Sequence, residues 1–213
     1  RLYQRSGFQK VVRKSRLLRL MSPRLSELEN LLPAIPSTTF RPTVQVVPAR
    51  EETRARVALL SGCVMPLVNG PQMNAVVRVL ARNGCEVVVP QAQVCCGALH
   101  THMGDLETAR GLAGRNIEAF LASGVDTLIV ASAGCGSRMK EYDHLLRDGP
   151  EYQDRAHRLS GMVKDIQEFL VELPFEPPTA RLDYRVTYQD SCHLSNAQRV
   201  TGPPRQVLMA IPG

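Results

Sequence analysis

Short apolar runs alternate with longer amphipathic stretches between residues 56 and 178, and this alternation constrains the fold more than any other feature of the sequence. The apolar runs predict strands, and the stretches with apolar residues every three or four positions predict helices. Strands that alternate with helices of this length form a parallel sheet with right-handed crossovers. The sequence therefore predicts an α/β fold: a parallel sheet with flanking helices and cysteine-bearing loops at the carboxyl ends of the strands, preceded by a short basic helical segment.

The individual elements follow from the same periodicity. The expected strands are residues 57–60, 86–89, 127–131 and 185–188. The expected helices are residues 71–82, about 105–122, about 138–146, about 151–171 and one that starts at 204. Asn83-Gly84 supplies a stop for the first of these helices, because glycine readily takes the left-handed conformation at a helix C-terminus.

The first part of the chain is strongly basic. Residues 1–24 hold eight basic side chains and no acidic one, so the other 189 residues carry about −2 of the total charge of +6. Apolar residues recur between these charges and predict an amphipathic helix over 2–21, broken at Gly7, and Ser22-Pro23 then starts a second helix that ends at Pro33. We expect a solvated or partner-docking face here; contact with a membrane surface or a nucleic acid is the alternative.

Composition sets the class of protein. The chain has 213 residues, 44% of them apolar and 22% charged, as in an ordinary globular protein. It contains neither a run of about 18 apolar residues that could span a membrane nor a recognisable secretory signal at its start. We therefore expect a cytoplasmic protein, with peripheral association with a membrane through partners left open, and no nucleic acid among its ligands.

Cysteine follows each expected strand. Cys63 comes after the first strand, Cys95-Cys96 after the second, Cys135 after the third and Cys192 after the fourth. The carboxyl ends of parallel strands meet at one edge of a sheet, where open α/β sheets bind ligands, so the first four thiols are expected to converge. The gaps of 31 and 38 residues are unlike those of a zinc knuckle, whereas four thiolates are the usual complement of an iron–sulfur cluster.

The residues alone leave several interpretations of these cysteines open. They are an iron–sulfur cluster, a zinc or other metal site, a thiol–disulfide redox centre, and a purely structural set. Gly62, Gly97, Gly134 and Gly136 flank the cysteines, where they would let backbone N–H groups approach a cluster and allow positive φ in the turns. Cys85 opens the second strand and is expected to be an ordinary buried apolar residue.

Three histidines are expected near the same edge of the sheet, namely His100, His102 and His193. Each is first of all an ordinary hydrogen-bonding residue, and hydrogen bonding to a cluster or its thiolates is the alternative. His144 and His157 fall on helices and are expected at the surface. Lys140-Glu141-Tyr142 is likewise expected to be part of a charged helix surface.

Several motifs carry a resemblance to a known family. They are Gly62-Cys63, Cys95-Cys96-Gly97-Ala98-Leu99-His100, Ala133-Gly134-Cys135-Gly136, Lys140-Glu141-Tyr142 and Asp190-Ser191-Cys192-His193-Leu194. Together with their spacing and the start Leu2-Tyr3-Gln4-Arg5-Ser6-Gly7, they resemble the cysteine-rich domain, named for its CCG motif, of the glycolate oxidase iron–sulfur subunit. The cysteine-rich subunit of heterodisulfide reductase and the lactate-utilisation iron–sulfur proteins are related.

The resemblance implies an oxidoreductase subunit without catalytic residues of its own, which relays electrons from flavoprotein subunits of a glycolate oxidase complex to an unknown acceptor. FAD would lie on the partner and not on this chain. The implied cofactor is an iron–sulfur cluster, of the 4Fe-4S type by the resemblance, with Cys63, Cys95, Cys96 and Cys135 as ligands. The implied surroundings of the cluster are Gly62, Gly97, Gly134, Gly136 and His100, and Cys192 is a candidate ligand of an incomplete second site.

The resemblance also divides the chain. Residues 1–32 are then the tail of a missing ferredoxin-like region, 33–54 a linker, 55–178 the first cysteine-rich domain and 179–213 the start of a truncated second one. Arg138 stands where heterodisulfide reductase relatives carry a fifth cysteine, which favours the glycolate oxidase branch. The alternatives are a heterodisulfide-reductase-like or lactate-utilisation redox protein, and a truncated assembly module without catalytic activity.

Overall fold

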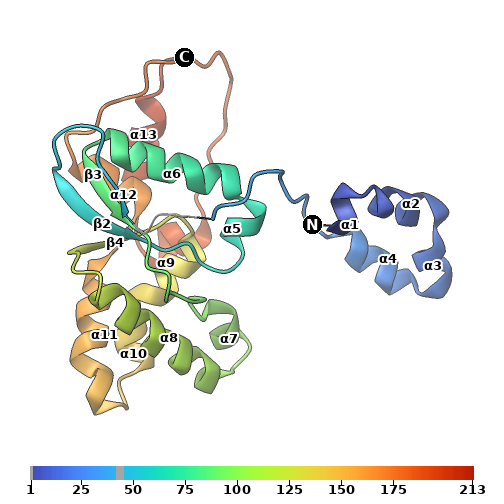
Figure 1. Cartoon of the computed structure of the whole chain (residues 1–213), viewed down its shortest axis with the longest axis horizontal. Coiled ribbons are helices and arrows are strands. Elements are labelled where there is room, and N and C mark those ends of the chain that lie inside the picture. The colour runs from blue at the N-terminus through green and yellow to red at the C-terminus, as the bar shows by residue number, and fades with distance from the viewer. Residues whose placement is uncertain (1, 42–45) are drawn as a thin grey trace.

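The computed structural model describes residues 2–41 and 46–213, and a five-stranded sheet lies at the centre of the part that it describes. The strand order is β1-β3-β2-β4-β5. The strands are β1 (Val46–Val47), β2 (Ala55–Leu59), β3 (Cys85–Val88), β4 (Thr127–Val130) and β5 (Val163–Asp165). Strands β2 to β5 are parallel, whereas β1 pairs with β3 in the antiparallel direction at one edge. The predicted α/β fold with flanking helices is confirmed (Figure 1).

Successive side chains of each strand point to opposite faces of the sheet, and they form one apolar layer on each face. Val57 and Leu59 of β2 point into the layer beneath α6 (Gly70–Arg82) and α12 (Ile166–Glu172). Ala58 points into the opposite layer, beneath α8 (Leu106–Leu121) and α11 (Pro150–Met162). Burying a Val, Leu or Ile side chain completely stabilises the fold by about 1.5–3 kcal/mol. Since successive side chains of a strand point to opposite faces, both faces of the sheet carry apolar residues, and helices cover both.

Further helical segments complete the sheet domain. They are α5 (Met65–Val68), α7 (Ala98–His102), α9 (Ala133–Lys140), α10 (Tyr142–Leu145), the π-helical turn η1 (His193–Ala197) and α13 (Gly202–Met209). No helix in the described ranges is long and apolar enough to cross a membrane.

The long helix expected over residues 151–171 is interrupted by a strand. Val163 to Asp165 form β5, which pairs with β4, and α11 and α12 flank it. Asp165 also caps α12: its carboxylate accepts from the Gln167 backbone N–H at 2.9 Å, and the Glu168 carboxylate accepts from the Asp165 N–H at 3.1 Å. Helical periodicity continues through this segment in the sequence, so only the pairing with β4 distinguishes the strand.

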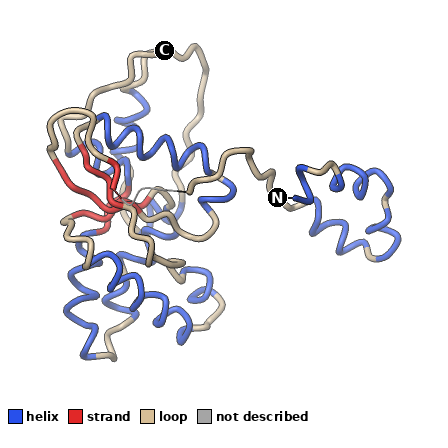
Figure 2. Tube along the Cα trace, in the orientation of Figure 1, coloured by secondary structure: helices blue, strands red, loops and turns tan. Residues whose placement is uncertain are grey.

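The strand expected at residues 185–188 does not form. These residues lie in an extended stretch with no strand assigned between 174 and 191, and Tyr184 and Val186 are exposed. Figure 2 shows the stretch as a loop near the C-terminus, away from the sheet. A strand needs a hydrogen-bonding neighbour, and none of the described strands pairs with this segment. Cys192 therefore follows a loop and not a strand of this sheet.

The N-terminal segment forms a separate helical unit at the end of an extended connection (Figure 2). Its helices are α1 (Leu2–Arg5), α2 (Phe8–Ser15), α3 (Leu17–Met21) and α4 (Pro23–Asn30). The break expected at Gly7 is confirmed, because this glycine has a φ of 79° and separates α1 from α2. Within the stretch expected to be a linker, 33–54, residues 42–45 lie outside the described residues, and Val46–Val47 forms β1.

Candidate metal centre

Four cysteines reach the carboxyl edge of the sheet from three connections. Cys63 lies shortly after β2, Cys95 and Cys96 lie between β3 and α7, and Cys135 lies in the first turn of α9, directly after β4. Cys135 is thus part of a helix that begins at Ala133, five residues earlier than the sequence predicts. The parallel direction of β2, β3 and β4 brings the three connections to one edge.

The four thiols form two contacting pairs. Cys63 Sγ lies 3.4 Å from Cys95 Sγ, and the Cys96 thiol is hydrogen-bonded to Cys135. The two pairs lie close enough for negative charge on Cys135 to raise the pKa of Cys63, and for negative charge on Cys95 to raise that of Cys96. The Gly97 backbone N–H also donates to Cys95 Sγ at 3.5 Å. One group of thiols with a donor from the backbone therefore lies at this edge.

The thiols differ in the ease with which they ionise. Hydrogen bonds from the Cys96 thiol and the Ser132 hydroxyl lower the pKa of Cys135 to about 6, although burial of this thiol acts in the opposite direction. The same hydrogen bond, followed by burial, raises the pKa of Cys96, and burial followed by the contact with Cys95 raises that of Cys63. A thiolate is the form that binds metals, so Cys135 is the first ligand available at neutral pH.

The flanking glycines have two different roles. Gly62 and Gly97 have φ values of 70° and 78°, so the positive φ expected in the turns is present at both. Gly134 and Gly136 lie inside α9 and have no positive φ, so the expectation is wrong for them. At Gly136 a Cβ would lie 2.9 Å from Gln198 Nε2, and the missing side chain thus admits the amide of Gln198 against α9.

The residues that hold the Cys95-Cys96 backbone were not predicted. Asn116, fully buried on α8, accepts the Val94 backbone N–H at 2.9 Å and donates to the Cys95 carbonyl at 3.0 Å. Its amide also donates to Tyr142 Oη at 3.2 Å, and this hydroxyl donates to the Cys96 carbonyl at 2.9 Å. The interpretation of Tyr142 as part of a charged helix surface is therefore wrong, because this side chain is fully buried. The sequence did contain a signal for Asn116, because this polar residue occupies a position on the apolar face of α8.

Gln93 joins the first two cysteine loops. Its side-chain oxygen accepts the Ser61 backbone N–H at 2.7 Å, and its side-chain nitrogen donates to the Leu59 carbonyl at 3.2 Å. The loop that carries Cys63 is thereby fixed to the loop that carries Cys95. Gln93 thus helps to set the distance between these two thiols.

The histidines near this edge have local partners. His100 Nδ1 lies 3.3 Å from Asp105 Oδ2, and Asp105 is the N-cap residue of α8. The rings of His102 and His193 face each other with centroids 5.8 Å apart. The role of His100 beside a cluster thus stays a prediction.

The other cysteines are distinct from the four. Cys85 is fully buried as expected, and burial raises its pKa to about 11, which makes the thiol unreactive. Cys192 is exposed at the start of η1, which is fixed to α9 by the hydrogen bond from Gln198 Nε2 to the Ala133 carbonyl at 2.9 Å. Its role as a ligand also stays a prediction.

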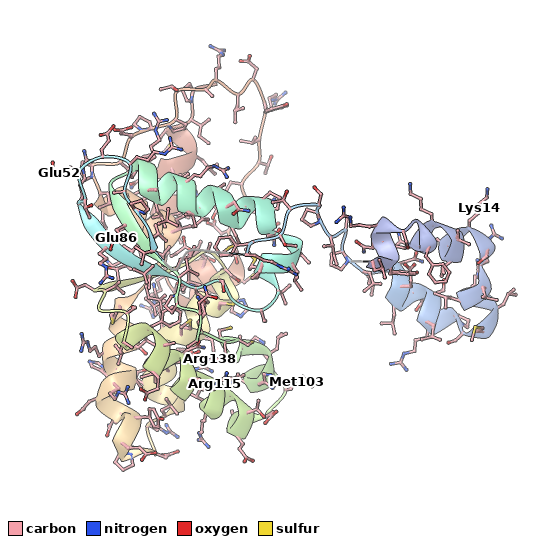
Figure 3. The ribbon with its side chains drawn as sticks, in the orientation of Figure 1. Lys14, Glu52, Glu86, Met103, Arg115 and Arg138 are labelled. Carbon is pink, nitrogen blue, oxygen red and sulfur yellow. The ribbon has the colours of Figure 1, made fainter. Side chains whose placement is uncertain are left out.

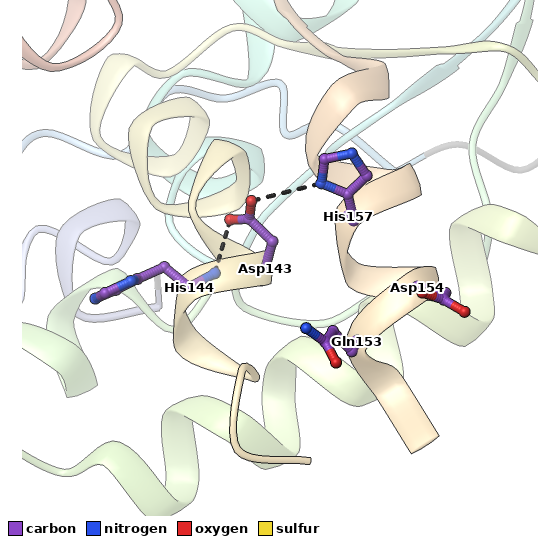
Figure 4. Close-up of a pocket in the computed structure, with 5 residues that line it drawn as sticks. All are labelled: Asp143, His144, Gln153, Asp154 and His157. Atoms are coloured by element: carbon purple, nitrogen blue, oxygen red, sulfur yellow. Dashed lines mark hydrogen bonds and ion pairs between the residues drawn. The ribbon is translucent and has the colours of Figure 1, made fainter. Parts of the chain in front are cut away.

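A second concentration of titratable groups lies between α10 and α11 (Figure 4). Asp143 accepts the His144 backbone N–H at 2.7 Å and lies 3.7 Å from His157 Nδ1. The side chains of His144 and Asp154 point away from this pair (Figure 4). His144 and His157 are exposed, as expected, and the pocket offers no convergent ligand set.

The donor chemistry at the sheet edge fits an iron–sulfur cluster. All four groups are thiols, the soft ligands that iron–sulfur clusters prefer, and the side chains of Gln93, Asn116 and Tyr142 hold the loops of Cys63, Cys95 and Cys96. Within the described residues, no group of three or more His, Cys, Asp or Glu side chains surrounds a single metal-ion position. In a cluster of several iron atoms the cysteine ligands are shared among those atoms, so they need not converge on one metal-ion position.

Comparison with known proteins places the chain among iron–sulfur proteins. Residues 57–140, which contain all four thiols, match the model of the CCG cysteine-rich domain, and residues 1–32 match the linker region of the glycolate oxidase iron-sulfur subunit. The chain belongs to the CCG cysteine-rich family. Within this family it is 43% identical, over 215 residues, to a probable glycolate oxidase iron-sulfur subunit of Bacillus subtilis; the match covers 100% of the chain and 48% of that relative.

Two other CCG-family relatives are more distant. The glycolate oxidase iron-sulfur subunit of Escherichia coli is 31% identical over 161 residues, which cover 74% of the chain and 40% of that relative. Lactate utilization protein A of Bacillus licheniformis is 31% identical over 159 residues, which cover 74% of the chain and 66% of the relative. The chain spans about half the length of the first of these three relatives and less of the second.

Proposed function

We propose that this chain is the iron–sulfur electron-transfer subunit of a flavin-dependent glycolate or other 2-hydroxyacid dehydrogenase complex. The observation that carries the proposal is the meeting of Cys63, Cys95, Cys96 and Cys135 at one edge of the sheet. The names of the relatives support the same function, since two of them are glycolate oxidase iron-sulfur subunits.

In this proposal the four thiolates bind a cluster of the 4Fe-4S type, which supplies one-electron transfer when bound. Gln93, Asn116 and Tyr142 hold the two cysteine loops in place. Cys96 is buried while Cys63 is exposed, so the site has an inner wall and an outer side open to a partner. Electrons enter from FAD on a flavoprotein subunit and leave to an acceptor through that open side, and the chain supplies no acid or base of its own.

Domain organisation and location are part of the proposal. Residues 55–178 are the first cysteine-rich domain, 179–213 the beginning of a second and 33–54 a linker, and residues 1–32 form the segment that matches the linker region of the glycolate oxidase iron-sulfur subunit. The complex is cytoplasmic, and any contact with a membrane is made through partners. Lactate is the alternative substrate of the complex, since lactate utilization protein A is among the relatives.

The burial and ion pairing of Arg138 weigh against heterodisulfide reduction. Its side chain is mostly buried and pairs with Glu141 Oε2 at 2.8 Å, in the place where heterodisulfide reductase relatives carry a fifth cysteine. A cationic side chain there supplies no thiolate for a second cluster.

Metal analysis tests the proposed function directly. After anaerobic reconstitution with iron and sulfide, we expect a brown protein with about four iron atoms per chain and an electron paramagnetic resonance signal after reduction. Cys96→Ser is expected to lose iron and colour, whereas Cys85→Ala, at a buried thiol away from the edge, is expected to keep both. A colourless, iron-free wild-type chain would refute the proposal and leave a structural or assembly role.

A further inference from the structure

The N-terminal helical unit, residues 2–32, has a polar interior. The Glu29 carboxylate on α4 is only 9% exposed and accepts hydrogen bonds from Tyr3 Oη at 3.1 Å, Gln9 Nε2 at 2.8 Å and Arg13 Nε at 2.8 Å. These bonds tie α1 and α2 to α4. A buried carboxylate with three donors, and not an apolar core, therefore holds the unit together.

The apolar side chains of this unit lie on its outside instead. Ten of them are between 47% and 83% exposed: Leu2, Phe8, Val11, Leu17, Leu20, Met21, Leu25, Leu28, Leu31 and Leu32. On α4, Leu25 and Leu28 are three residues apart and share one side of the helix, next to the side that carries Glu29. Apolar surface gathered in this way marks an interaction site.

The charge of the unit indicates the kind of partner. Residues 1–24 contain six arginines and two lysines without an acidic residue, and Lys14 extends away from the unit (Figure 3). A complementary surface must therefore be acidic around an apolar centre. Protein interfaces are enriched in Arg, Met and aromatic residues and depleted in Lys, which matches this unit, with its excess of Arg, better than it matches a lipid-binding helix.

The connection that follows the unit is anchored on the sheet domain. The Phe40 backbone N–H donates to the Pro66 carbonyl at 2.9 Å, and Phe40 is buried. The backbone at Thr38 packs directly against Gly70, where a side chain would not fit, because a Cβ on residue 70 would lie 2.4 Å from the Thr38 carbonyl oxygen. On the side of the unit, Gln4 donates to the Pro33 carbonyl at 2.9 Å and accepts the Ile35 backbone N–H at 2.8 Å, so the connection between the two anchored ends is short.

We propose that residues 2–32 dock into an acidic groove with an apolar floor on a protein partner. This inference rests on the proposed function, under which the partner is the flavoprotein subunit of the complex. The exposed leucines fill the groove, the arginines pair with its acidic rim, and Glu29 keeps the helices in the shape that fits.

Co-elution of the purified chain with the flavoprotein subunits of the glycolate oxidase from the same organism tests the docking. We expect Leu20→Ser/Leu25→Ser/Leu28→Ser to weaken the association at least about tenfold. Lys10→Glu/Lys14→Glu is expected to weaken it at low salt more than at high salt. Val186→Ser, at a similarly exposed apolar residue of the C-terminal stretch, is the matched control and is expected to bind normally.

Three results would overturn the inference. The first is normal association of both N-terminal variants with the flavoprotein subunits. The second is loss of binding to phosphatidylglycerol vesicles, with flavoprotein binding intact, which would identify a lipid surface as the partner. The third is a dimer of the chain alone that these substitutions dissociate. Iron content separates this test from that of the proposed function, because all of these variants are expected to keep their cluster.

Discussion

The hydroxyl of Tyr142 donates a hydrogen bond of 2.9 Å to the backbone carbonyl of Cys96, although the two residues are 46 positions apart in the chain. Tyr142 is fully buried, and Asn116 donates to the same hydroxyl. Two polar side chains under the cysteine loop thus hold the backbone that carries two of the four thiols. The position of the candidate metal centre depends on helices α8 and α10 as much as on the cysteines.

Tyr142→Phe is expected to destabilise the cluster-free chain by about 1–3 kcal/mol, because it leaves the Cys96 carbonyl and one Asn116 donor unsatisfied in the core. Denaturant unfolding measures the loss. Tyr184→Phe, at an exposed tyrosine, is the control and is expected to change nothing. A double-mutant cycle with Asn116→Ala should give a coupling of about 0.5–3 kcal/mol, and additive effects would contradict the network.

Gly97→Ala is expected to destabilise the fold by about 1 kcal/mol or more, because residue 97 has a φ of 78° and a Cβ would lie 3.4 Å from the backbone of Ala109. Gly111→Ala is the matched control: this glycine lies within α8 with open space around it, so alanine is expected to stabilise by about 0.5–1 kcal/mol. Thermal unfolding compares the two variants. Equal effects of the two substitutions in the same direction would show that the positive φ at residue 97 does not require glycine.

Alkylation of the cluster-free chain is expected to begin at Cys135. The pKa of this thiol is about 6, so it is a thiolate at pH 7 and becomes protonated as the pH falls through 6. The rate of modification by iodoacetamide, followed by peptide mass spectrometry, should therefore rise between pH 5 and pH 7 at Cys135. Over the same range Cys85, whose pKa is about 11, should remain unmodified. A midpoint near the ordinary thiol value for Cys135 would contradict the hydrogen bond with Cys96.

Acid is expected to loosen the N-terminal unit before the sheet domain. The hydrogen bond from Arg13, helped by Gln9 and Tyr3, lowers the pKa of Glu29 against desolvation. Because the pKa of Glu29 is lower in the folded unit than in the unfolded chain, its ionised carboxylate stabilises the unit at every pH above the unfolded-state pKa. This stabilisation is lost as the pH falls through the folded-state pKa. Hydrogen exchange of residues 2–32 measures the change, and Glu29→Gln should remove most of its pH dependence. Glu27→Gln, at an exposed carboxylate of the same helix, is the control.

Local sequence was sufficient for the features that neighbouring residues determine. Periods of two and of three to four residues predicted β2, β3, β4, α6 and α8. Glycine chemistry predicted the break at Gly7 and the end of α6 at Asn83-Gly84, where Gly84 has a φ of 79°. The meeting of the cysteine loops also followed, because parallel strands that end in cysteine must bring their ends to one edge.

The tertiary structure decided what depends on distant partners. β5 is a strand only because β4 hydrogen-bonds to it, whereas none of the described strands pairs with residues 185–188, which remain a loop. Asn116 and Tyr142 hold the backbone of Cys95 and Cys96 from two other helices. Hydrogen bonds of this kind join groups 21 to 46 residues apart, and their energy exists only once the chain has folded, so no local pattern contains them.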